Sequence, residues 1–215
     1  MMASAQIIKE KTENARARSN IYRLLSIAFF KELSPESISI FARDNIKETL
    51  KDLDIDFGKE FYSRGEDKLL KELTEEYAAL FIVPGGVNPT ESVARSGLYM
   101  QAFASQAAQF YKKCGFTLPD DFKGFPDHIG IELEFMSHLA ESEANACKKG
   151  REDEAKKWIE FQKKFLQEHI SQWALTFAQN VATYTRQSFY REMARLLYEF
   201  IRLEAVELSV EIEGL

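Results

Sequence analysis

The stretch FPDHIGIELEFMSHL, residues 125–139, decides the fold class of this chain. Pro126 has a fixed φ angle and no N–H to lose, and Asp127 can accept a hydrogen bond from a following N–H group. Together they predict a helix that begins at about residues 126–128. Apolar residues then follow at helical spacing, which is typical of a largely buried helix; they are Ile129, Ile131, Leu133, Phe135, Met136 and Leu139.

The expected helix also carries four ionisable residues, His128, Glu132, Glu134 and His138. The first two stand one helical turn apart, as do the last two, and buried ionisable groups need partners. Two plain explanations are an N-cap role for Asp127 and an exposed first-turn position for His128. A di-metal bundle needs Glu-x-x-His from two helices and two further glutamates, whereas the spacing here is i, i+4 with no second copy. We therefore expect no metal and no cofactor, and a helical metal-binding or hydrolytic enzyme that uses these four residues is an alternative.

Composition favours an all-helical fold without disulfides. The 215 residues suit a single domain, and they include 17 phenylalanines but only 10 glycines and 5 prolines, with no sustained strand-like alternation. Cys114 and Cys147 lie far apart and fit neither a disulfide framework nor a zinc motif, so reduced thiols in the cytoplasm are expected. The net charge of −6 disfavours a nucleic-acid surface.

The apolar run at residues 24–30 follows Arg16, Arg18 and Arg23 and imitates a signal peptide. Ser26 interrupts the run and no small-residue cleavage site follows it, so we expect neither a signal peptide nor a membrane span. The sequence predicts a cytoplasmic protein.

Periodicity and capping signals predict about seven to nine helices in a single domain spanning residues 1–215. Ser34-Pro35-Glu36 and Ser63-x-x-Glu66 indicate two helix starts, the second as a capping box, whereas residues 52–62 and 82–93 read as irregular. The glycine- and proline-containing connector at 115–125 is expected to act as a hinge between helical groups at about 1–114 and 126–215. The expected helices lie at about residues 4–31, 35–50, 66–81, 98–114, 126–148 and 151–166, then at 170–181 and from 188 to the end of the apolar pattern near 201.

Several motifs, taken in order, resemble those of the TorD/DmsD/NarJ-type chaperones, which attend the maturation of molybdenum-containing redox enzymes. The matching residues are Tyr77, Leu80 and Phe81 at a helix end, Pro89, Ser92 and Val93 in a proline-rich loop, Pro126, Asp127 and His128, and His169 with Trp173. Thr90 stands where some members have Trp, and Gly124-Phe125 replaces a frequent Glu-Pro pair. These departures indicate a divergent branch.

The resemblance implies a TorD-like all-α fold and a chaperone with no catalytic residues. Such a chaperone holds the twin-arginine signal peptide, or the apo-subunit, of a molybdoenzyme until its cofactor is inserted. It implies a monomer or dimer, no nucleic acid and no membrane insertion. The implied partner-binding residues are Tyr77, Leu80, Phe81, Pro89, Ser92, Val93, Asp127 and His128, with Glu76, Glu91 and Glu132 as acidic neighbours.

A twin-arginine peptide presents two arginines and an apolar segment, so its binder needs acidic acceptors beside an apolar groove. Asp127→Asn is therefore expected to weaken binding by about 1–3 kcal/mol. Stability should change little, because Asn caps a helix about as well as Asp. Alternatively, the motif residues only pack in a structural interaction domain, as an apolar stripe such as Tyr77, Leu80 and Phe81 commonly does. A nucleotide site lacks support, because Val83–Gly86 is too short to cradle phosphates.

Overall fold

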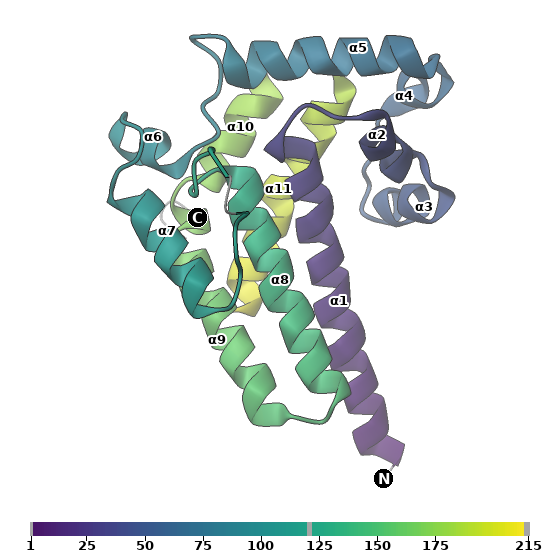
Figure 1. Cartoon of the computed structure of the whole chain (residues 1–215). Coiled ribbons are helices and arrows are strands. Elements are labelled where there is room, and N and C mark those ends of the chain that lie inside the picture. The colour runs from purple at the N-terminus through teal and green to yellow at the C-terminus, as the bar shows by residue number, and fades with distance from the viewer. Residues whose placement is uncertain (1, 120–121, 213–215) are drawn as a thin grey trace.

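A computed structural model describes residues 2–119 and 122–212, and within them it contains eleven α-helices and no β-strand (Figure 1). The predicted all-helical fold is confirmed. The helices are α1 (Met2–Phe30), α2 (Pro35–Ala42), α3 (Asp44–Asp52), α4 (Gly58–Ser63), α5 (Glu66–Tyr77), α6 (Glu91–Ser96), α7 (Ala102–Lys113), α8 (Ile129–Lys148), α9 (Glu152–Glu168), α10 (Ala174–Tyr184) and α11 (Ser188–Glu207), with a π-helical turn at Ala78–Ile82 and a 3-10 turn at Ile170–Gln172.

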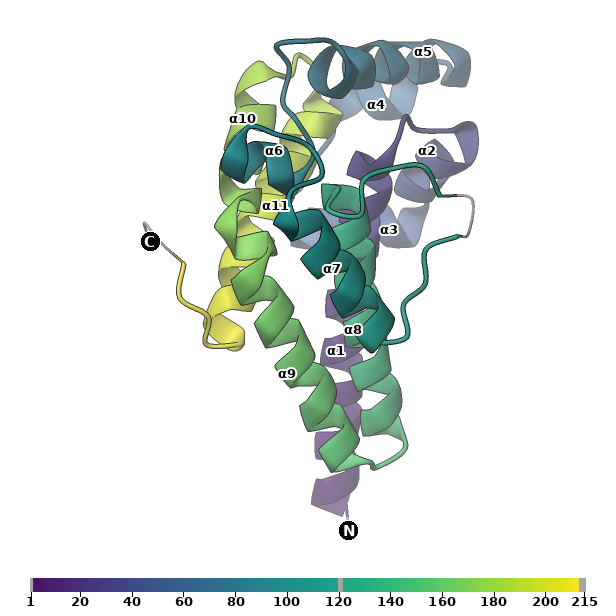
Figure 2. The ribbon, with the colours of Figure 1, turned by 60° about the vertical axis from the view of Figure 1, so that its left-hand side comes forward.

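The two long helices α1 and α8 run antiparallel in close contact along their lengths (Figures 1 and 2). Small residues permit this approach: a Cβ atom added to Gly130 would lie 2.5 Å from the Cα atom of Phe30. The Ser26 hydroxyl donates to the carbonyl oxygen of Gly130 at 2.7 Å, and the Ser19 hydroxyl donates to that of Ser137 at 3.0 Å. These hydrogen bonds satisfy buried hydroxyl groups that would otherwise oppose close packing.

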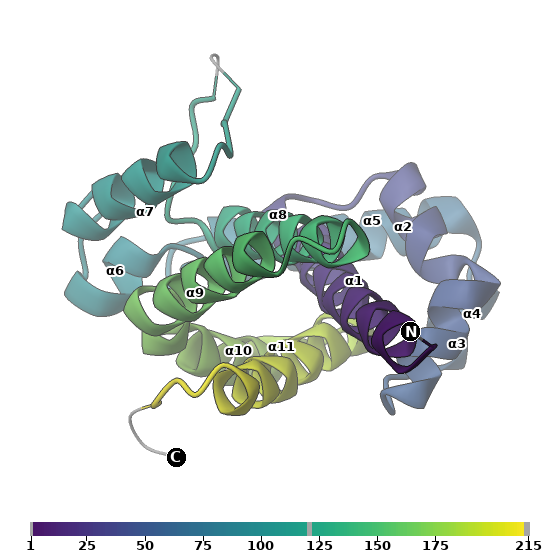
Figure 3. The ribbon, with the colours of Figure 1, turned by 90° about the horizontal axis from the view of Figure 1, so that it is seen from below.

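The central bundle consists of α1, α8, α9, α10 and α11. Viewed along the bundle, α6 and α7 lie on one side and α2, α3 and α4 on the other (Figure 3), while α5 crosses one end (Figure 1). Aromatic rings fill the core, which accounts for the abundance of phenylalanine. Edge-on or tilted ring contacts link Phe29 to Phe81 and Phe177, Phe41 to Phe57 and Phe189, and Phe135 to Phe110, Tyr111 and Phe165.

The expected helix starts are partly correct. Ser34 caps α2 as predicted, because its Oγ accepts the N–H of Ser37 at 3.2 Å. The predicted capping box at Ser63 is wrong. Ser63 ends α4, a helix in the segment expected to be irregular, and its hydroxyl donates instead to the carbonyl oxygen of Lys59 at 2.8 Å.

Two further boundaries differ from the expectation. The helix expected at 35–50 breaks at Arg43, whose extended backbone (ψ 137°) separates α2 from α3. The loop expected at 82–93 contains the start of α6, which ends at Gly97 with φ +76°. That left-handed residue and Met100 at φ +54° prevent a helix from starting at 98, so α7 begins at Ala102.

Helices α1 and α8 come from opposite sides of the connector at 115–125, so the two expected groups share one core. Residues 120–121 of the connector lie outside the described part, and its hinge role stays a prediction. Among the helices described, none combines the length and the hydropathy that a bilayer crossing requires.

Candidate functional site

Helix α8 begins one residue later than expected, and Asp127 does not cap it. His128 is the N-cap residue, and its Nδ1 atom accepts the N–H of Gly130 at 3.1 Å. The Asp127 side chain accepts the N–H of Ser92 through Oδ2 at 2.8 Å. The backbone carbonyl oxygen of Asp127 accepts the N–H of Glu91 at 2.9 Å. Asp127 therefore caps the short helix α6, where the N-cap residue Thr90 makes no side-chain cap.

The two motif segments around residues 89–92 and 127–129 form one unit. A single antiparallel bridge pairs Thr90 with His128, and the N–H of Ile129 donates to the carbonyl oxygen of Pro89 at 2.8 Å. Pro89, Ser92 and Asp127 are buried, whereas His128 is half-buried. The structure thus brings together two motifs that lie more than thirty residues apart in the sequence.

Four buried side chains gather beneath this unit, and we call Glu91, Asp127, Glu132 and His169 the Asp127 cluster. Glu91 and Asp127 come from α6 and its cap, Glu132 from α8, and His169 from the end of α9. All four are nearly or fully buried.

Each carboxylate of the Asp127 cluster is oriented by a donor outside the cluster. The Arg95 Nη1 atom lies 2.6 Å from Glu91 Oε1, and Trp173 Nε1 donates to Glu132 Oε2 at 3.1 Å. Inside the cluster, Glu91 Oε2 lies 2.7 Å from His169 Nδ1. The second oxygens of Asp127 and Glu132, Oδ1 and Oε1, are buried without a hydrogen-bond partner.

Burial shifts the acid–base behaviour of this region. It raises the pKa of the Glu132 carboxyl well above its ordinary value, and the nearby Glu91 carboxylate raises it further. Burial also lowers the pKa of His128 to about 4. The neutral His128 ring is the form that accepts the Gly130 N–H, and it packs edge-on against Phe30.

The remaining predicted site residues lie elsewhere. Tyr77, Leu80 and Phe81 belong to the buried core, as the packing alternative proposed, and Val93 is half-buried. Glu76 is not part of the cluster, because its carboxylate accepts the backbone N–H of Arg186 at 2.5 Å. Whether these residues contribute to partner binding stays a prediction.

The four residues of the enzyme alternative do not converge on one centre. His138 Nε2 lies 3.2 Å from the carbonyl oxygen of Cys114, and His128 caps α8. In the described ranges, the donor group with metal-like spacing is Glu91, Glu132 and His169 instead. Sequence reasoning gave no site role to His169, Trp173 or Arg95, although the first two stand out as an i, i+4 pair in the C-terminal pattern.

Two cavities flank the Asp127 cluster. One, of about 590 Å³, opens between α7 and α9 and has His169 in its lining. The other, of about 330 Å³, lies between the 85–88 loop and α10 and has Trp173 in its lining. Several large apolar side chains in the same region are each more than half exposed. They lie just before the 85–88 loop, just before α7 and at the end of α10, and they are Ile82, Val83, Leu98, Tyr99, Met100 and Tyr184.

The exposed segment 98–100 is tied to the motif unit. Asn88 donates to the Tyr99 hydroxyl at 2.6 Å, and the Tyr99 ring stacks on Phe125 with 4.7 Å between centroids. The N–H of Gln101 donates to the Ser92 hydroxyl at 3.1 Å. These contacts place an exposed apolar segment beside the buried acids.

A second buried polar cluster lies toward the other end of α1 and α8, and we call Arg18, Tyr22, Glu143, Gln162 and Glu204 the Arg18 cluster. The Arg18 guanidinium contacts Glu143 at 2.9 Å, Glu204 at 3.3 Å and the Gln162 side-chain oxygen. The Tyr22 hydroxyl donates to Glu204 at 3.0 Å.

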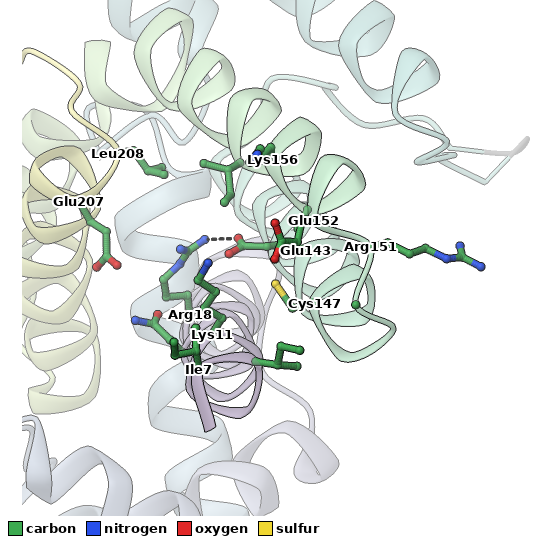
Figure 4. Close-up of a pocket in the computed structure, with 15 residues that line it drawn as sticks. Ile7, Lys11, Arg18, Glu143, Cys147, Arg151, Glu152, Lys156, Glu207 and Leu208 are labelled. Carbon is green, nitrogen blue, oxygen red and sulfur yellow. Dashed lines mark hydrogen bonds and ion pairs between the residues drawn. The ribbon is translucent and has the colours of Figure 1, made fainter. Parts of the chain in front are cut away.

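The cavity of about 420 Å³ beside Arg18 is lined by side chains of both signs, including Lys11, Lys156, Glu152 and Glu207 (Figure 4). Four basic and three acidic residues line it, Arg18 and Glu143 form an ion pair there, and none of the motif residues lines it.

Comparisons with known proteins agree on one family. Residues 42–179 match the family model described as nitrate reductase delta subunit. The chain is 25% identical over 217 residues to the chaperone protein TorD of Shewanella pealeana, covering 92% of each chain. It is 27% identical over 215 residues to TorD of Vibrio cholerae (strain M66-2), covering 94% of each.

The fold also matches a crystal structure of a putative redox enzyme maturation protein from Archaeoglobus fulgidus, with a TM-score of 0.59 at 20% identity. That match covers 86% of this chain and 93% of the other. The chain therefore belongs to the nitrate reductase delta subunit family and, within it, to the TorD-type chaperones of redox enzyme maturation.

Proposed function

We propose that this chaperone works in the cytoplasm, where it binds the twin-arginine signal peptide of a molybdenum-containing oxidoreductase subunit until the cofactor is inserted. The observation that carries the proposal is the unit formed by residues 89–92 and 127–129. Through Asp127 it holds α6 against α8, with acids beneath it and exposed apolar residues beside it. Cys114 and Cys147 are free, which fits a reducing compartment.

The apolar part of a signal peptide needs an accessible surface. Tyr77, Leu80 and Phe81 are buried against the aromatic core, so they stabilise the fold around the site and are not exposed to a peptide. The exposed residues of segment 98–100 are available to a peptide, and Tyr99 is already fixed by two contacts. Burial of such side chains is the main favourable term in helix or strand recognition.

The arginines of the peptide need a carboxylate that can be reached from the surface. Glu91 is itself buried, but its partner Arg95 is partly exposed and stacks on the Phe103 ring at 4.0 Å. A peptide guanidinium that replaces Arg95 would meet the same carboxylate oxygen, Oε1, while Oε2 stays beside His169. Asp127 acts indirectly in this proposal, because it is fully buried and positions α6.

The proposal assigns no catalytic role to the cluster. A hydrolase needs a nucleophile with a general base in reach, and the contacts of the Asp127 cluster are those of carboxylates, an imidazole and an indole. Recognition is therefore the chemistry that this arrangement supports best.

The test begins with tagged full-length protein expressed in its native host, followed by mass spectrometry of the oxidoreductase that co-purifies. Its labelled signal peptide is then titrated against the purified chaperone, alongside a twin-lysine version of the same peptide. We expect at least tenfold weaker binding of the twin-lysine peptide, since Lys cannot reproduce the planar guanidinium contact. Added salt should weaken the native complex. Equal affinity for both peptides would contradict recognition of the arginines.

A further inference from the structure

Glu91, Glu132 and His169 come from α6, α8 and the end of α9, yet each offers a donor atom within 4.8 Å of the other two. Donor atoms bound to one Zn²⁺ ion at about 2.1 Å lie at most about 4.2 Å apart. Side-chain shifts of less than about 1 Å would therefore bring the three donors into a single coordination sphere. Contrary to the expectation of no metal drawn from the sequence, we propose that Glu91, Glu132 and His169 bind one divalent transition-metal ion, and that Zn²⁺ suits this donor set best.

Carboxylates that bind a metal ion are commonly oriented by a hydrogen bond from a residue that does not itself contact the ion, and both glutamates have such a donor. Arg95 holds Glu91 through Oε1, which leaves Oε2 beside His169 Nδ1. Trp173 holds Glu132 through Oε2, which leaves Oε1 buried without a partner. In each residue one oxygen is held from outside the cluster, while the other contacts only His169 in Glu91 and has no partner in Glu132.

Asp127 supplies an independent indication of missing positive charge. Its Oδ1 atom is fully buried and has no hydrogen-bond partner, while Oδ2 is held by Ser92. Buried carboxylate oxygens without partners are costly, and a bound cation would offset that cost. Among the described arginine and lysine residues, Arg95 forms an ion pair with the cluster, and it contacts Glu91 alone.

One member of the cluster, His169, lines the open 590 Å³ cavity between α7 and α9. The other residues that line this cavity are Gln106, Gln109, Phe110, Lys113, Lys164 and Glu168. The bound ion would link α6, α8 and α9, and so would fix the motif unit on the bundle. The inference shares Glu91 with the proposed peptide contact, but the ion would use Oε2 and the peptide would use Oε1. The metal titration contains no peptide, so either proposal can fail without the other.

The rival state contains a proton in place of the ion. Burial and the neighbouring Glu91 charge favour a protonated Glu132, which could share its proton with Glu91. Glu132→Gln separates the two states. A glutamine imitates the neutral acid and preserves the shape of the site, but it removes an anionic ligand.

The experiment uses full-length protein dialysed against a chelator and then titrated with Zn²⁺ in competition with a chromophoric chelator. We expect one Zn²⁺ per chain and at least about tenfold weaker binding by Glu132→Gln and by His169→Gln. The control His138→Gln changes a histidine outside the cluster and should bind Zn²⁺ as the wild type does. Melting curves recorded without metal check that each variant folds, and Zn²⁺ should raise the melting temperature of the wild type but not of Glu132→Gln.

X-ray absorption of the Zn²⁺-loaded wild type provides a test that does not depend on variants. We expect nitrogen and oxygen ligands only, whereas a sulfur ligand would place the ion at Cys114 or Cys147 and overturn the proposal. Absence of stoichiometric Zn²⁺ from the wild type would also overturn it, in favour of the shared proton. Unchanged affinity in both Glu132→Gln and His169→Gln would do the same.

Discussion

The Arg18 cluster and the Asp127 cluster are both buried, but they differ in how their carboxyl groups are satisfied. In the Arg18 cluster, Glu204 Oε1 forms an ion pair with Arg18 at 3.3 Å, and Glu204 Oε2 accepts the Tyr22 hydroxyl. Glu143 Oε2 accepts hydrogen bonds from Arg18 and Gln162, and the atom left without a hydrogen-bond partner is Arg18 Nε, a donor. In the Asp127 cluster, Asp127 Oδ1 and Glu132 Oε1 have no donor. Both clusters adjoin cavities, so the difference lies in the carboxylates: those of the first cluster are paired with a guanidinium, whereas two carboxyl oxygens of the second have no donor. Buried charges that are fully paired support structure, and those that are not are candidates for binding.

The largest effect on stability should come from breaking the Arg18 cluster. Arg18→Met leaves two buried carboxylates without their guanidinium, so we expect a loss of about 3–5 kcal/mol in the free energy of unfolding. The control Arg151→Met breaks an ion pair on the surface, in which the Arg151 and Glu154 side chains are 60% and 43% exposed. It should lower the free energy of unfolding by less than about 1 kcal/mol. Urea unfolding measures both variants. A small loss for Arg18→Met would show that the first cluster is not the structural one.

The next effect concerns Asp127 and revises the expectation drawn from the sequence. Because Asp127 caps α6 and not its own helix, Asp127→Ala leaves the buried N–H of Ser92 unpaired and should cost about 1–3 kcal/mol of stability. Asp127→Asn retains one acceptor oxygen and should fall between wild type and Ala. Urea unfolding gives the free energies.

The matched control for Asp127 is Ser34→Ala. Ser34 also accepts a backbone N–H at a helix start, that of Ser37, but it lies outside the Asp127 cluster and the predicted binding residues. We expect Ser34→Ala to leave signal-peptide affinity unchanged, whereas Asp127→Ala should weaken it by displacing α6. Similar losses of affinity in the two variants would mean that stability alone accounts for the effect.

A smaller effect should appear in the pH dependence of stability. Burial lowers the pKa of His128 to about 4, below the unfolded value of about 6.5, so the folded state favours the neutral ring. This contribution is fully present above about pH 6.5 and is lost as the pH falls toward 4, with a slope of up to about 1.4 kcal/mol per pH unit. His128→Asn can still cap α8 and should reduce that slope between pH 6.5 and 4.5. Urea unfolding across this range measures the difference, and identical slopes would contradict a neutral, buried His128.

The helices could be predicted because their signal is local. Apolar spacing of 3.6 residues and the cap at Ser34 act within a few neighbouring residues, and both are visible in the sequence. Helix α6 gave no such signal, since it is six residues long and its cap, Asp127, comes from a distant segment. The same long-range contact explains why the N-cap assigned to Asp127 was wrong.

The candidate site could be predicted only in part for the same reason. Glu76, Glu91 and Glu132 were expected as acidic neighbours of Asp127; Glu91 and Glu132 do meet it in the fold, whereas Glu76 contacts Arg186 elsewhere. The convergence with His169 depends on how α9 packs on α8, which periodicity within one helix does not reveal. Burial of Tyr77, Leu80 and Phe81 was foreseen by the packing alternative, because an apolar stripe at helical spacing indicates a core face.

The central claim is that a signal peptide binds beside the Asp127 cluster. Titration of the labelled twin-arginine peptide against the double variant Leu98→Ser/Met100→Ser tests it most directly. The matched control is Leu203→Ser/Val206→Ser, which removes two apolar residues on α11 that are at least as exposed as Leu98 and Met100. We predict at least about tenfold weaker binding by the first variant, since each lost apolar contact is worth about 1 kcal/mol or more, and wild-type affinity in the control. Unchanged affinity in the first variant, or an equal loss in both, would contradict the placement of the site.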